Sequence, residues 1–103
     1  MAIRFDGTST NCFSRTSGLP SFNGAYTWMG WVRLVTDLNT AGNFWAITDA
    51  TFASYDTVGV DVDGTTLYAS TDVGAWGGVA LTVGTPYHIT FVRESSSLAR
   101  LYV

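Results

Sequence analysis

Residues 25–34, A-Y-T-W-M-G-W-V-R-L, decide the fold expected for this chain. Aromatic and other β-forming residues dominate the stretch, which favours a strand over a helix. Side chains of a strand alternate between two faces, and one face here is apolar: Tyr26, Trp28, Gly30, Val32 and Leu34. The opposite face also includes large apolar side chains and carries Thr27, Met29, Trp31 and Arg33. The stretch therefore predicts a central strand covered on both faces, with Gly30 leaving room beside Trp28.

Short strand patterns separated by turn signals recur along the chain, without any long helical period. Further strands are predicted at residues 3–5, 11–15, 44–48, 58–62, 67–71, 87–93 and 98–103. Residues 73–79, V-G-A-W-G-G-V, are predicted to form a glycine-rich loop. The expected core residues are Ile3, Phe5, Trp28, Val32, Trp45, Val60, Ile89 and Phe91. Such spacing is typical of an antiparallel β-sandwich.

Length and charge limit the classes of protein that the chain can represent. Its 103 residues predict one domain spanning residues 1–103, and a net charge of -3 without a basic cluster argues against nucleic-acid binding. No apolar run approaches the roughly 20 residues of a membrane helix, so no membrane insertion is expected. Arg4 and Asp6 interrupt any signal-peptide core in the given sequence. A lone Cys12 forms no internal disulfide and is expected to be a small buried hydrophobe.

Four segments resemble the laminin-G-like, concanavalin A-like lectin and glucanase family. They are residues 2–7 (A-I-R-F-D-G), 26–33 (Y-T-W-M-G-W-V-R), 84–90 (G-T-P-Y-H-I-T) and 99–103 (A-R-L-Y-V). Pro86 departs from the family, which usually has Trp there. The resemblance implies a jelly roll, and the family continues past L-Y-V into further strands. We therefore expect an incomplete sandwich, completed by a further polypeptide segment or by homo-oligomerisation, although a self-sufficient sandwich of this length is possible.

Catalysis is not expected. Glucanases of the resembled superfamily use an E-x-D-x-x-E strand to place two carboxylates about the scissile bond, and Glu94 is the sole glutamate of this chain. Asp61 and Asp63 are interpreted as the solvent-facing side of a hairpin that ends in a D-G turn. His88 alternates with apolar residues within a predicted strand, which favours a hydrogen-bonded structural imidazole over a general base.

Calcium is a possible cofactor. Hard cations take several oxygen ligands, often from loops, and suitable side chains occur at predicted strand ends: Asp37, Asn39, Asp49, Asp56 and Asp72. The resemblance makes a loop-bound calcium plausible, but no liganding motif of the family matches here residue by residue.

Sugar binding requires an aromatic platform beside polar groups. Trp76, expected at a loop tip, is the first candidate platform, with Asp72 and Thr71 beside it as hydrogen-bonding groups. The alternative is that Trp76 folds back and caps the sandwich. Trp31 and Arg33, on one face of their strand, form a second candidate, and ordinary sheet packing is the alternative there.

These observations predict a non-catalytic module that binds a glycan or glycoprotein. The alternative is a structural or assembly protein, such as a virion or surface-adhesion component, that uses the jelly roll as a scaffold. Either function favours an extracellular or virion-surface location.

Overall fold

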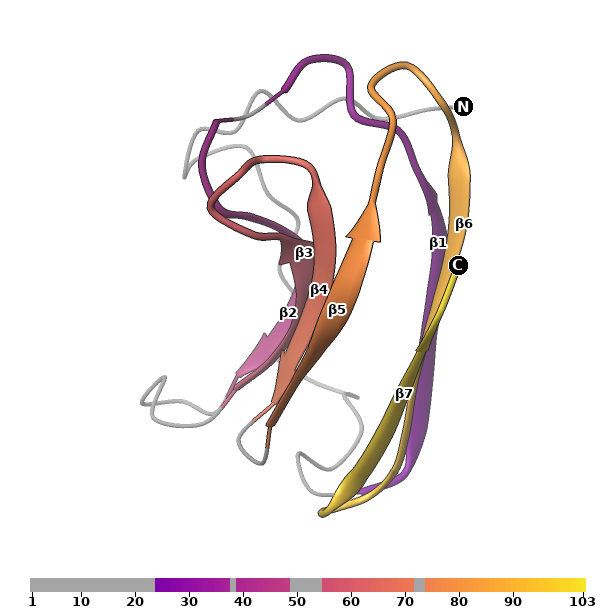
Figure 1. Ribbon diagram of the computed structural model, residues 1–103. Helices are drawn as coiled ribbons and strands as arrows, with labels where there is room; N and C mark the ends of the chain where they lie inside the picture. The colour runs from indigo at the N-terminus through magenta and orange to yellow at the C-terminus, as the bar shows by residue number, and fades with distance from the viewer. Residues whose placement is uncertain (1–23, 38, 49–54, 72–73) are drawn as a thin grey trace.

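The computed structural model describes residues 24–37, 39–48, 55–71 and 74–103, and all regular structure in that part is β-strand. The strands are β1 (Tyr26–Val32), β2 (Gly42–Thr48), β3 (Tyr55–Val60), β4 (Thr66–Thr71), β5 (Gly74–Ala80), β6 (Tyr87–Ser95) and β7 (Leu98–Tyr102). They form two antiparallel sheets with strand orders β1-β6-β7 and β2-β3-β4-β5. Figure 1 shows the two sheets as facing layers. The predicted all-β, antiparallel architecture is confirmed, and it is compatible with a β-sandwich.

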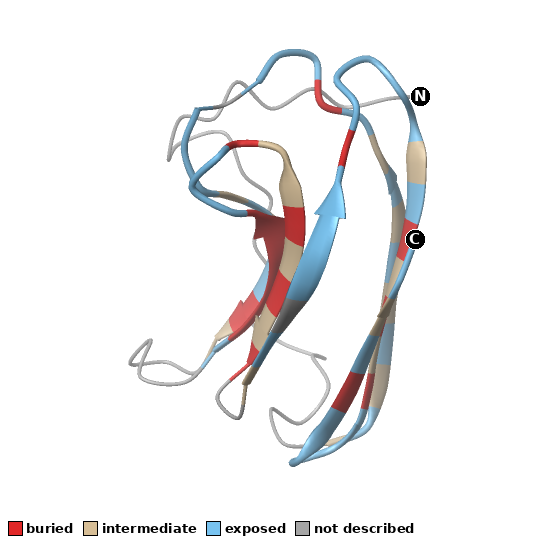
Figure 2. Ribbon diagram, viewed as in Figure 1, coloured by how far each residue is buried: buried red, intermediate tan, exposed pale blue. Residues whose placement is uncertain are grey.

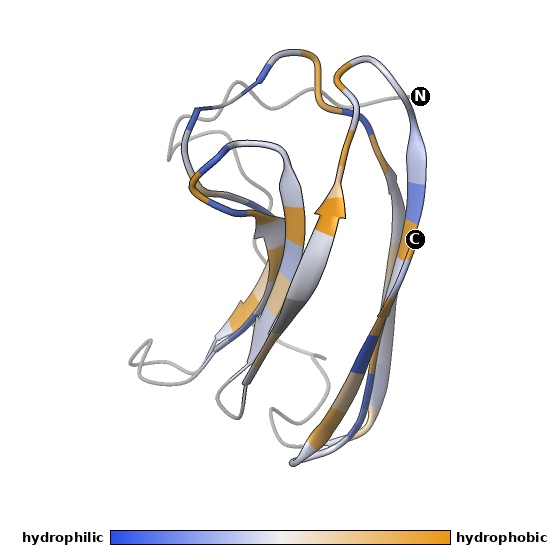
Figure 3. Cartoon of the chain, in the orientation of Figure 1, coloured by the Kyte–Doolittle hydropathy of each residue, from blue (hydrophilic) through white to orange (hydrophobic). Residues whose placement is uncertain are grey.

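The hydrophobic core lies between the two sheets. Val58, Val60 and Leu67 come from one sheet and Ile89 and Phe91 from the other, and all five are fully buried. Buried positions alternate along β4 and β6, which produces bands in Figure 2, and Figure 3 shows the corresponding apolar positions. The predicted core positions of Val60, Ile89 and Phe91 are therefore confirmed.

The remaining predicted core residues have different outcomes. Trp28, Val32 and Trp45 are partly buried and pack against the core. Ile3, Phe5 and Cys12, together with the strands predicted at residues 3–5 and 11–15, lie outside the described residues.

Strand β1 is not central among the described strands. Within the described part of the chain its one pairing partner is β6, which occupies the middle of the β1/β6/β7 sheet. The outer face of β1 is open, because the side chains of Met29 and Trp31 are 61% and 72% exposed. The prediction that both faces of this strand are covered was wrong, since large apolar residues on both faces do not by themselves establish that both are covered. Its central position stays a prediction, because the strands expected at residues 3–5 and 11–15 lie outside the described residues.

Residues 74–79 of the predicted glycine-rich loop instead belong to the strand β5, while Val73 lies outside the described residues. The strand pairs with β4, and the register shifts opposite Leu67 and Tyr68, leaving Gly78 as the extra residue. Gly78 has a φ of 112°, which glycine adopts readily, so the residue is the bulge of an otherwise regular strand. The loop prediction failed because glycine in a strand can mark a bulge as well as a turn.

A second bulge lies in β2, where the register against β3 shifts between Asn43 and Trp45. As a result the consecutive side chains of Phe44 and Trp45 are both partly buried against the core. The ring of Trp45 stacks on that of Trp28 with a centroid separation of 5.8 Å.

The described part of the chain contains no helix that is long and apolar enough to cross a membrane.

Candidate functional site

Strand β3 divides its residues between the core and the outer face of the β2/β3/β4/β5 sheet. Val58 and Val60 are core residues, so the alternating positions of Tyr55, Thr57 and Gly59 lie on the outer face. Residues directly opposite in an antiparallel pair share a face, which assigns their partners on β2 and β4 to the same surface.

The first row across this outer face consists of small side chains. Thr57 lies opposite Ala46 of β2 on one side and opposite Ser70 of β4 on the other. These three residues form a low floor that crosses three strands.

The second row contains Asn43, Gly59 and Tyr68, again on β2, β3 and β4. The hydroxyl of Tyr68 donates a hydrogen bond to Oδ1 of Asn43 at 2.7 Å. Because β3 runs between the two strands, this bond passes over Gly59, which has no side chain to obstruct it. A Cβ at position 59 would lie 2.1 Å from the carbonyl oxygen of Gly42, so glycine is required for this close approach.

The two rows shape a groove of about 500 Å³. We call it the tyrosine groove, and its lining residues are Asn43, Ala46, Thr48, Tyr55, Thr57, Tyr68 and Ser70. Tyr55, which is 45% exposed, borders the floor on one side, and the bonded pair of Tyr68 and Asn43 borders it on the other. Tyr55 and Gly59 are four residues apart along β3, or about 13 Å.

Thr57 has an unusual position on the floor of this groove. The residue is only 6% exposed, and its Oγ1 has no hydrogen-bond partner among the described residues. Most buried polar atoms in folded proteins are paired, and an unpaired one is destabilising. Oγ1 is itself fully buried, so a ligand in the groove would not contact it without a local rearrangement.

The residues predicted as a sugar site lie elsewhere, at two separate places. Trp76 lies within β5 with its backbone opposite that of Ala69, rather than at a loop tip. Thr71, at the end of β4, is 7% exposed and donates a hydrogen bond to the carbonyl of Gly74 at 3.4 Å. Asp72 lies outside the described residues. None of these observations tests their proposed role in binding.

The second predicted pair lies on the opposite sheet. Trp31 and Arg33 are both exposed. The ring of Trp31 contacts His88 edge-on, with centroids 5.3 Å apart, across the register pair that joins β1 to β6. His88 is itself exposed rather than enclosed in the fold.

The predicted calcium ligands do not gather in the described part of the chain. Within residues 24–37, 39–48, 55–71 and 74–103, no three His, Cys, Asp or Glu side chains are grouped to hold a metal ion. The carboxylate of Asp37 accepts a hydrogen bond from the amide of Asn39 at 2.9 Å, and Asp56 is buried. Asp49 and Asp72 lie outside the described residues, so calcium binding stays a prediction.

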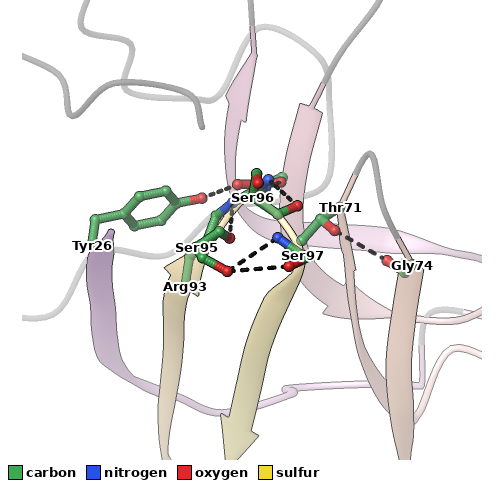
Figure 4. A network of polar contacts seen from close by, with 8 residues as sticks. Tyr26, Thr71, Gly74, Arg93, Ser95, Ser96 and Ser97 are labelled. Carbon is green, nitrogen blue, oxygen red and sulfur yellow. Dashed lines mark hydrogen bonds and ion pairs between the residues drawn. The ribbon is translucent and has the colours of Figure 1, made fainter. Parts of the chain in front are cut away.

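Asp56 belongs to a buried triad with Tyr26 and Arg93 that joins the two sheets. Nη1 of Arg93 lies 2.5 Å from Oδ1 of Asp56, with both side chains fully buried, and the Tyr26 hydroxyl donates to Oδ2. Nε and Nη2 of Arg93 donate to the carbonyls of Ser95 and Ser96 at 3.2 and 3.3 Å (Figure 4).

The role of the buried triad is structural rather than ligand binding. Burial, followed by the hydrogen bond to the Asp56 carboxylate, raises the pKa of Tyr26 and keeps its hydroxyl protonated as a donor. Both carboxylate oxygens of Asp56 are already engaged within the triad. The triad therefore fixes β3 against β1 and β6.

Comparison with protein-family models, curated proteins and solved structures found no match for this chain.

Proposed function

We propose that the chain is a non-catalytic glycan-binding module and that the tyrosine groove is its binding site. Sugar rings present C–H faces that pack on aromatic side chains and hydroxyls that need hydrogen-bond partners. The tyrosine groove offers both: two tyrosines, an asparagine and three small hydroxyl side chains. The observation that carries the proposal is the groove itself, in which Tyr55 and Tyr68 lie on either side of a strip of small and hydroxyl side chains.

The proposed function agrees with the resemblance to the laminin-G-like family. That resemblance rests on residues 2–7, 26–33, 84–90 and 99–103, and both the family and the jelly roll that it implies are proposals. The site differs from the one that the sequence favoured, because the described residues that line the groove lie on the surface of a sheet. Of its members, Tyr68 and Ser70 were interpreted only as part of the strand predicted at residues 67–71. Tyr55 and Thr57 precede the strand predicted at residues 58–62, whereas β3 begins at Tyr55.

Tyr55→Ala is expected to weaken glycan binding by about tenfold or more, which corresponds to about 1.4 kcal/mol. The reason is the loss of a ring that borders the groove and is half exposed, so that its removal affects binding more than folding. The measurement is a glycan array followed by titration of each positive glycan. Trp31→Ala is the matched control, because it removes an exposed aromatic ring from the opposite sheet.

Trp76→Ala tests the site that was expected from the sequence. Binding that survives Tyr55→Ala but disappears in Trp76→Ala or Trp31→Ala would show that the ligand binds elsewhere.

A second candidate function, assembly with another protein or a second copy of the chain, is supported by the outer face of the β1/β6/β7 sheet. Met29, Trp31 and Tyr102 are 61%, 72% and 51% exposed there. Exposed apolar surface of this kind is often an interaction site. If the face mediates self-association, sedimentation velocity should show an oligomer that Trp31→Ser dissociates. A monomer at all concentrations would exclude self-association through this face.

A further inference from the structure

We infer that Asn43 and Tyr68 make the tyrosine groove selective for a sugar unit with free hydroxyls on two neighbouring carbons, a vicinal diol; this inference rests on the proposed function. The amide of Asn43 donates a hydrogen bond to one hydroxyl of the diol. The phenolic oxygen of Tyr68 accepts a hydrogen bond from the other, and Tyr68 also holds the Asn43 amide in one orientation.

The pairing of the strands brings Asn43 and Tyr68 together over Gly59. The three residues lie opposite one another on β2, β3 and β4, and adjacent strands are about 4.8 Å apart. The Cα atoms of Asn43 and Tyr68 are therefore about 10 Å apart, a gap that the two side chains fill by meeting tip to tip. Their hydrogen bond of 2.7 Å shows that they do meet in this way.

This hydrogen bond determines which donors and acceptors remain for a ligand. Tyr68 uses its proton to bond Oδ1 of Asn43, so the phenolic oxygen keeps lone pairs that accept hydrogen bonds. The two N–H groups on Nδ2 of Asn43 are donors, and they make no hydrogen bond to another described residue. The terminal torsion of an asparagine side chain is otherwise broad, so the bond to Oδ1 restricts where these donors point. The pair thus presents an acceptor and two donors side by side.

Both members of the pair are accessible to a ligand. Asn43 is exposed and Tyr68 is partly exposed, and both line the groove. In the absence of a ligand, water therefore hydrates their remaining polar groups. A ligand gains by displacing ordered water only if it replaces the hydrogen bonds of that water. Sugar hydroxyls can do so, because each one both donates and accepts.

A vicinal diol fits the spacing of the pair. The remaining donors and the remaining acceptor belong to two groups joined by a 2.7 Å hydrogen bond, so the two ligand oxygens that bond them must also be close. Hydroxyls on neighbouring ring carbons meet this requirement. Hydroxyls separated by a further carbon lie further apart and engage one member of the pair at a time.

The test uses two β-linked glucose hexamers that differ in linkage alone. Cellohexaose leaves two neighbouring ring hydroxyls free on every unit. Laminarihexaose is linked through the carbon between its free ring hydroxyls, so its interior units lack a vicinal diol. In calorimetric titrations, we expect cellohexaose to bind about tenfold more tightly, a difference typical of one hydrogen bond between protein and ligand.

Two variants assign this preference to the pair. Asn43→Leu removes the amide donors at nearly constant side-chain size, and Tyr68→Phe removes the hydroxyl but keeps the ring. Each should weaken the binding of cellohexaose about tenfold and that of laminarihexaose by less than about threefold, so that the preference disappears. A merely structural role would lower both affinities equally. Because the hydrogen bond of the pair is exposed, the thermal midpoints should stay within about 3 °C.

Tyr102→Phe is the matched control for Tyr68→Phe. It removes the same atom from a tyrosine that is 51% exposed on the β1/β6/β7 sheet, and it should change neither affinity.

The outcomes separate this inference from the proposed function. If the two hexamers bind equally well, or if the preference for cellohexaose survives in Asn43→Leu, this inference is wrong, while loss of binding in Tyr55→Ala still supports the groove. If neither hexamer binds, this inference is also wrong, and the glycan array with Tyr55→Ala decides the proposed function by itself. Should Asn43→Leu fail to fold, Tyr68→Phe decides the outcome through the same ratio of affinities.

Discussion

Arg93→Met is expected to lower the free energy of unfolding by about 3–5 kcal/mol. The substitution removes the guanidinium that lies 2.5 Å from Oδ1 of Asp56 and leaves that carboxylate fully buried without a cation. The hydrogen bond from the hydroxyl of Tyr26 would remain, but a single neutral donor does not replace the lost charge. Because the buried triad joins β3 to β1 and β6, its loss also removes a polar connection between the sheets.

Urea unfolding of the variant against the unaltered chain measures this effect. Arg100→Met is the control, since the pair of Arg100 and Glu94 is exposed to solvent and should contribute little to stability. The combined variant Tyr26→Phe, Asp56→Leu, Arg93→Met should recover much of the lost stability, because replacing a whole buried ionic group by apolar residues is often neutral or stabilising. A cost of Arg93→Met no larger than that of Arg100→Met would mean that Asp56 is hydrated, contrary to the described burial.

Gly59→Ala is expected to cost about 3 kcal/mol, at the upper end of the range for inserting a methyl group into a packed site. The new Cβ would lie 2.1 Å from the carbonyl oxygen of Gly42 and 2.8 Å from the Cα of Asn43. Both are backbone atoms, so β2 must move away from β3. The same movement would break the hydrogen bond between Tyr68 and Asn43 and open one side of the tyrosine groove.

Gly30→Ala is the matched control for this variant. A Cβ at position 30 would meet the ring of Trp28 at 3.4 Å, which is close to ordinary van der Waals contact. We expect a stability change within about 1 kcal/mol for Gly30→Ala, by urea unfolding, with glycan binding unchanged. Equal losses in the two variants would contradict the close approach of β2 and β3 at Gly59.

Alternation of side chains predicted much of the fold correctly. The strand predicted at residues 87–93 is present within β6, and that predicted at 67–71 lies within β4. The same alternation contained a signal for the buried triad that was not used. Asp56 shares a face with Val58 and Val60, and Arg93 shares one with Ile89 and Phe91. Two opposite charges on two apolar faces are expected to pair, although sequence alone does not show which residues meet across 37 positions.

The tyrosine groove was not predictable in the same way. Its rows depend on the register between β2, β3 and β4, and the bulge between Asn43 and Trp45 shifts that register by one residue. A shift of this size moves side chains to the opposite face, so Asn43 meets Tyr68 over Gly59 only in the observed pairing. The sequence analysis instead chose Trp76 and Trp31 as candidate platforms for a sugar ring. That choice depended on the residue type and its predicted element, and not on how the strands pair.

Amide chemical-shift mapping with a bound neutral hexasaccharide tests the central claim most directly. The account predicts that the largest shifts fall on the residues of the tyrosine groove in β2, β3 and β4, with Thr57 and its neighbours among them. Shifts centred on Trp31 and His88 of the β1/β6/β7 sheet, or on Trp76 of β5, would contradict it, as would the absence of any shift at saturating ligand.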